Sequence, residues 1–130
     1  MRYDPAVPPQ STEWLALDEA EQIALVEKYH RRAGIDLPNA TLHALIHTTV
    51  ERQLAAQLSP VVNALQRLQA EGLDRHDAIH AIGAVLAEHM RRLMIGEINV
   101  PDPNPIYFAG LDRLSAASWR REYGDSDNAI

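Results

Sequence analysis

The hydrophobic positions along the chain recur with the period of an α-helix. In one stretch they fall four residues apart, at Leu42, Ile46, Val50 and Leu54. Side chains at this spacing lie on one face of a helix, one turn above the next. No stretch alternates apolar and polar residues with the two-residue period of a β-strand. The pattern therefore predicts an all-α fold, a bundle of four main helices with an additional C-terminal helix.

Capping residues, glycines and prolines predict where these helices begin and end. The four main helices are expected at residues 18–33, 39–57, 59–72 and 74–96, and the C-terminal helix at 111–122. Residues 1–10 are rich in proline and are expected to form an extended arm. Residues 99–105 hold three prolines and are expected to be a linker to the C-terminal helix. The whole chain, residues 1–130, is expected to be a single helical domain.

Composition removes several classes of function. The chain of 130 residues has no Cys, which excludes disulfides, thiolate zinc sites and iron–sulfur clusters. Its net charge of -6 argues against nucleic acid as a partner, because nucleic-acid binding needs a basic surface. No apolar stretch is long enough for a signal peptide or a membrane span. We therefore expect a cytoplasmic protein with no membrane partner.

Histidine is the residue type that points to chemistry. Four of the six histidines form two pairs with one pattern, His-x-x-Ile-His, at His43/His47 and His76/His80. Residues four apart lie about 6 Å from each other along a helix axis, on the same face. Two imidazoles placed in this way can bind one metal ion. Each pair is therefore a candidate half of a metal site.

Topology and one carboxylate extend the candidate site. In a bundle with short loops the second and fourth helices run parallel, so both histidine pairs are expected at the same end. Glu51 stands one turn after His47 and is expected to be a fifth ligand or an acceptor that orients a ligand. The predicted metal ligands are therefore His43, His47, His76, His80 and Glu51. A divalent ion, zinc, iron or nickel, suits these ligand types.

The remaining two histidines, His30 and His89, stand outside the pairs and are expected to be ordinary packing or surface residues. The zinc-protease motif His-Glu-x-x-His is absent, and only one Glu-x-x-His motif of the two that a di-iron bundle needs is present, at Glu27 to His30. No reaction and no catalytic residue follow from the sequence. The alternative is a non-catalytic interaction or adaptor protein, in which the histidine pairs are structural and the arm and C-terminal helix dock a protein partner or a second subunit.

Two longer motifs carry a resemblance. One has the pattern H-x3-H-x3-E-x-Q, with His43, His47, Glu51 and Gln53, and the other has R-H-x3-H followed by a glutamate, with Arg75, His76, His80 and Glu88. With these motifs, residues 37–95 resemble a bacterial family known as domain of unknown function 1841. A further carboxylate of the family pattern falls at Ala84 here, so the resemblance does not imply a carboxylate-bridged two-metal site. It implies that the histidines and glutamates act as one unit, and it implies no reaction.

Overall fold

The protein is all-α across residues 1–35, 37 and 39–123, which are the residues that the computed structural model describes. The fold class predicted from the sequence is thereby confirmed. The helices of this part of the chain are α1 (Ser11–Ala16), α2 (Glu19–Ala33), α3 (Ala40–Ala55), α4 (Ser59–Ala70), α5 (Arg75–Met94), α6 (Asn104–Arg113) and α7 (Ala116–Tyr123).

The ends of α2, α3 and α5 follow from their capping residues. Asp18, Asn39 and Asp74 each accept a hydrogen bond from the backbone N–H three residues further on. Gly34 ends α2 in the left-handed conformation, with φ 72°, which costs glycine little because it has no Cβ. These starts and stops agree with the sequence prediction. The helix α4 begins at Ser59, as expected, with Leu58 before it, no side-chain cap and a proline in its first turn.

The C-terminal region differs from the prediction. The expected linker ends early, because α6 begins at Asn104 and accommodates Pro105 in its first turn, where no intrahelical N–H bond is lost. The single expected helix at 111–122 is instead interrupted between α6 and α7. Ser115 and Ser118 explain the new start, since each side-chain oxygen accepts a hydrogen bond from the other residue's backbone N–H.

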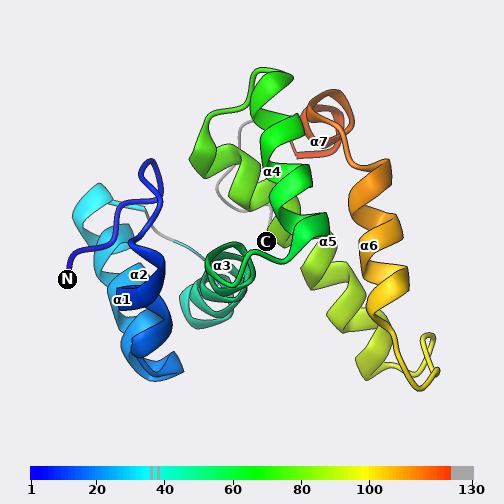
Figure 1. Cartoon of the computed structure of the whole chain (residues 1–130), viewed down its shortest axis with the longest axis horizontal. Helices are drawn as coiled ribbons and strands as arrows, with labels where there is room; N and C mark the ends of the chain where they lie inside the picture. Colours follow the sequence, from blue (N-terminus) through cyan, green and yellow to red (C-terminus); the bar gives the residue numbers. More distant parts are fainter. Residues whose placement is uncertain (36, 38, 124–130) are drawn as a thin grey trace.

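The helices do not form the up-and-down bundle that the sequence suggested. Figure 1 shows α3 end-on in the middle of the molecule, with α1 and α2 on one side and α4 to α7 on the other. The turn between α3 and α4 contains Gln57 at φ 59°, and it sends α4 across α3 instead of back along it. The axes of α3 and α5 therefore cross, and the predicted parallel arrangement is wrong.

The helix α3 separates two hydrophobic cores. The larger core packs the inner faces of α3 to α7 and includes Ile46 and Ile82, both almost fully buried. The smaller core joins the N-terminal arm, α1, α2 and the other face of α3 around Tyr3 and Trp14. Among the described residues, no helix combines the length and the apolarity that a membrane crossing requires.

Candidate metal centre

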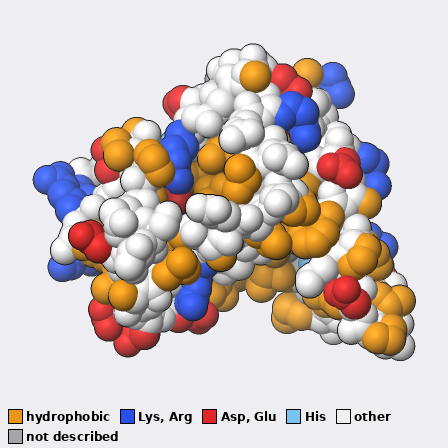
Figure 2. Space-filling model, viewed as in Figure 1, with side chains coloured by type: hydrophobic (Ala, Val, Ile, Leu, Met, Phe, Trp, Pro, Cys, Tyr) orange, Lys and Arg blue, Asp and Glu red, His pale blue; other side chains and the backbone are white. Residues whose placement is uncertain are grey.

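Histidines from three helices gather where α2, α3 and α5 meet. They are His30 of α2, His43 and His47 of α3, and His76 and His80 of α5. All are buried except His76, which is half-buried. Figure 2 shows hardly any histidine colour on the visible face of the protein, in keeping with this burial. The two pairs found in the sequence are thus brought together, as predicted, although by a different helix arrangement.

The crossing of α3 and α5 decides which rings meet. The ring centroids of His43 and His80 are 5.0 Å apart, and those of His47 and His76 are 5.4 Å apart. The ring of His47 lies equally close to that of His80, with the centroids 5.4 Å apart, so it contacts both histidine rings of α5. The two histidine pairs still come together, although the helices are not parallel, because both pairs lie where α3 and α5 cross.

Four of these residues form a group that could hold a metal ion. His30, His47, His76 and His80 each offer one ring nitrogen, and all four nitrogens lie within 4.8 Å of one another. Two imidazole nitrogens on one tetrahedral zinc ion are about 3.3 Å apart, because each bond is about 2.0–2.1 Å long. Inward ring movements of about 1 Å or less would bring the four nitrogens to that spacing.

The expectation that His30 stands apart from the two pairs is wrong, because it lies in this group. Pair spacing could not identify it, since its partners lie on other helices. The sequence did carry one usable signal. His30 lies on the buried face of α2, four residues after Val26, and a histidine on an apolar face needs polar company.

His43 lies next to the group rather than in it. Its Nε2 is 3.1 Å from Nε2 of His30. The Nδ1 of His30 lies 2.9 Å from the carbonyl oxygen of Val26 and must donate to it, because a carbonyl only accepts. In neutral rings, Nε2 of His30 is then the acceptor and Nε2–H of His43 the donor. The lone pair on Nε2 of His30 thus points toward Nε2 of His43.

His47 is oriented by a residue that sequence reasoning missed, Tyr3 of the N-terminal arm. The Tyr3 hydroxyl donates its proton to Oε2 of Glu51 at 2.5 Å. Its oxygen lies 2.9 Å from Nδ1 of His47, so Nδ1–H of the histidine is the donor to that oxygen. Nε2 of His47 is buried and has no hydrogen-bond partner within the described part of the chain.

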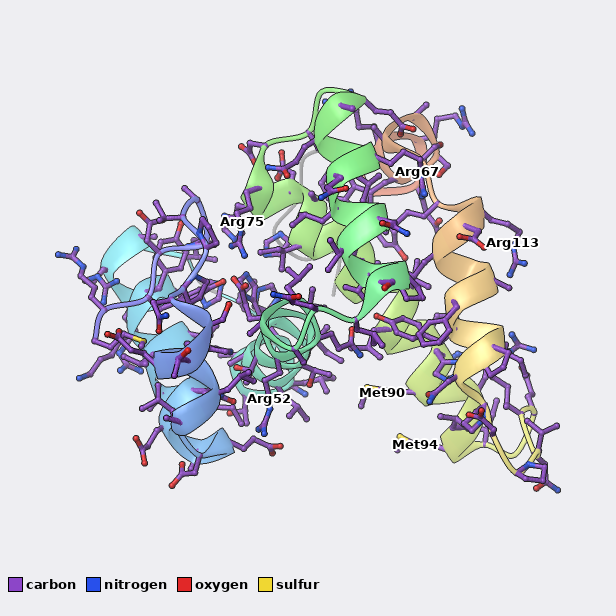
Figure 3. All side chains as sticks on the ribbon, viewed as in Figure 1. Arg52, Arg67, Arg75, Met90, Met94 and Arg113 are labelled. Atoms are coloured by element: carbon purple, nitrogen blue, oxygen red, sulfur yellow. The ribbon has the colours of Figure 1, made fainter. Side chains whose placement is uncertain are left out.

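Glu51 lies one step away from the histidine group. Arg75 at the start of α5 binds both of its oxygens, with 2.7 Å from Nη2 to Oε1 and 2.9 Å from Nη1 to Oε2. The glutamate is 1% exposed and the arginine 8%. Figure 3 shows Arg75 at the side of α5 that faces the arm and α3. Of the two predicted roles for Glu51, this placement favours the outer acceptor, which reaches His47 through Tyr3.

Burial keeps two of the rings neutral. It lowers the pKa of His47 well below the usual histidine value, and the nearby rings of His80, His76, His43 and His30 lower it further. Burial also lowers the pKa of His80 to about 2, with smaller effects from His76, His43 and His30. Both side chains are therefore neutral at pH 7, which is the form that binds a metal ion.

The other residues of interest in the sequence lie elsewhere. His89 packs against Tyr107 of α6, with ring centroids 5.5 Å apart. Gln53 accepts a hydrogen bond from the hydroxyl of Tyr107 at 2.8 Å. Glu88 forms an exposed ion pair with Arg91 of the same helix. None of these described contacts joins the histidine cluster.

Comparison of the chain with known protein families, with curated proteins and with solved structures finds no match. The resemblance to the domain of unknown function 1841 family therefore stays a prediction. The assignment of the site rests on the geometry of the chain itself.

Proposed function

We propose that this chain is a metal-binding protein that holds one transition-metal ion between the imidazoles of His30, His47, His76 and His80. The observation that carries the proposal is the convergence of four ring nitrogens from three helices within 4.8 Å. Unligated imidazoles gain little from gathering in a protein interior, because each must be desolvated and hydrogen-bonded there. A bound cation would give all four nitrogens a common partner.

The ligand set favours a structural ion. Zinc, iron and nickel all accept imidazole ligands, and zinc is the one that commonly takes four protein ligands in a closed tetrahedral site. Catalytic zinc sites usually keep one position open for water or substrate. An ion held by four imidazoles would instead tie α2 to α3 and α5, and its binding energy would add to the stability of the fold.

The test is to load untagged protein with Zn²⁺ and compare it with protein treated with a chelator. We expect about one zinc per chain, and at a free zinc concentration of 1,000 times Kd a rise in unfolding free energy of about 4 kcal/mol. Elemental analysis gives the stoichiometry, and denaturant unfolding gives the stability. The proposal is overturned if the loaded wild-type protein holds less than a tenth of an equivalent of zinc, and equally little iron or nickel after loading with Fe²⁺ or Ni²⁺.

Two variants complete the test. His47→Ala combined with His80→Ala removes two ligands and should abolish zinc binding. His89→Ala removes a histidine that lies on α5 but packs against Tyr107, away from the cluster, and should leave the stoichiometry unchanged. Equal loss of zinc from both variants would mean that binding does not depend on the proposed site.

A further inference from the structure

The N-terminal arm places one side chain inside the molecule. Tyr3 is 1% exposed although it precedes every helix. Its ring lies 5.5 Å from the ring of Trp14 and 6.2 Å from that of Tyr29. The ring of His47 packs perpendicular to it, with an interplanar angle of 90° and the centroids 5.4 Å apart. Tyr3 is therefore a wall of the histidine cluster as well as part of the smaller core.

Two arginines tie the backbone of the arm beside the cluster. Nη2 of Arg32 donates to the carbonyl oxygen of Tyr3 at 2.9 Å, and Nη1 of Arg75 donates to that of Pro5 at 2.9 Å. Arg32 follows His30 by two residues on α2, and Arg75 directly precedes His76 on α5. The arm is thus attached to the same helix ends that carry the candidate ligands.

The direction of the hydrogen bonds gives Tyr3 a chemical role. The carboxylate of Glu51 binds two guanidinium nitrogens of Arg75 and can only accept, so the single proton of the Tyr3 hydroxyl points to it. The Tyr3 oxygen can then only accept from Nδ1–H of His47.

We propose that Tyr3 is a positioning residue of the metal site, whose hydroxyl holds His47 as the Nδ1–H tautomer with the Nε2 lone pair available to the ion. The inference rests on the proposed function for its metal-binding consequence. The row from Arg75 through Glu51 and Tyr3 to His47 acts as the outer support that metal-ligating histidines usually have. Here the support is delivered by the N-terminal arm, which makes the arm part of the site.

Tyr3→Phe tests this role by removing only the hydroxyl and keeping the ring that packs on Trp14. Loss of an outer hydrogen-bond partner typically weakens metal binding 10–100-fold, and we expect that loss for Zn²⁺, with faster transfer of zinc to a competing chelator. Tyr107→Phe is the matched control, because it deletes a buried hydroxyl that bonds Gln53, outside the site. The control should bind zinc like the wild type.

The tautomer of His47 provides a second measurement, because it would not change if Tyr3 had only a structural role. Imidazole ¹⁵N signals of the metal-free wild-type protein should show His47 protonated at Nδ1, and Tyr3→Phe should remove this preference, whereas Tyr107→Phe should not. Protonation at Nε2 in the wild type overturns the proposal even if Tyr3→Phe fails to fold. Zinc affinity within threefold of wild type in folded Tyr3→Phe also overturns it. Absence of zinc binding in the wild type would refute the proposed function instead, and the tautomer measurement would still decide the role of Tyr3.

Discussion

Replacing Arg75 with methionine is expected to lower the free energy of unfolding by about 3–5 kcal/mol. The substitution keeps an apolar stem of similar length but leaves the carboxylate of Glu51, which is 1% exposed, without its cation. A buried charge that loses its partner keeps the full cost of its desolvation. The arm also loses its hydrogen bond at Pro5. Denaturant unfolding of metal-free protein, in the presence of a chelator, measures the change.

Two further variants identify the cause of that loss. Arg91→Met breaks an ion pair with Glu88 whose side chains are 53% and 56% exposed, and should cost less than about 1 kcal/mol. Adding Glu51→Gln to Arg75→Met removes the uncompensated charge and should restore part of the stability. A loss for Arg75→Met no larger than that for Arg91→Met would show that the buried pair does not stabilise the fold in this way.

Acid is expected to destabilise the metal-free protein well above the pH at which carboxylates titrate. His47 and His80 have folded-state pKa values far below the unfolded value of 6.5. Above pH 6.5 both states are neutral at these rings and stability does not depend on them. Below it only the unfolded chain gains the protons, so stability falls by about 1.4 kcal/mol per pH unit for each ring. The two rings together should remove about 3 kcal/mol between pH 8 and pH 5.5.

Chelator-treated protein, unfolded by denaturant at a series of pH values from 8 to 5, provides the measurement. His80→Gln has no ring to protonate at that position, so its stability should fall about half as steeply between pH 6 and pH 5. Constant wild-type stability down to pH 5.5 would contradict the prediction, as would an equal slope in the variant. Groups that face these rings are the other cluster imidazoles and, at His47, Tyr3 with the Glu51–Arg75 pair behind it.

Local signals in the sequence were sufficient for the boundaries of several helices. The caps Asp18, Asn39 and Asp74 and the stop at Gly34 were predicted, because each depends on a few neighbouring residues. The boundary between α6 and α7 was missed, although Ser115 carried a local signal for it. The crossing of α3 and α5 was missed for a different reason, since a crossing angle depends on how distant side chains pack.

For the candidate site, too, the features that depend on local sequence were predictable and those that depend on distant contacts were not. The absence of Cys restricts any metal ligands to imidazole and carboxylate, and the four-residue spacing places two histidines on one face of α3 and two on one face of α5. These conclusions need only composition and helix geometry. Which ring nitrogens converge, and what orients them, could not be derived from either.

The sequence by itself thus determined the helical fold class, most helix ends and the type of ligand. Only the tertiary structure brought His30 into the group, set His43 beside it, and joined Glu51 to Arg75 and Tyr3. The physical reason is the distance along the chain over which each kind of interaction acts. Helix formation and capping are decided within a few residues, whereas these contacts join the arm to three helices and exist only after the two cores on either side of α3 have packed.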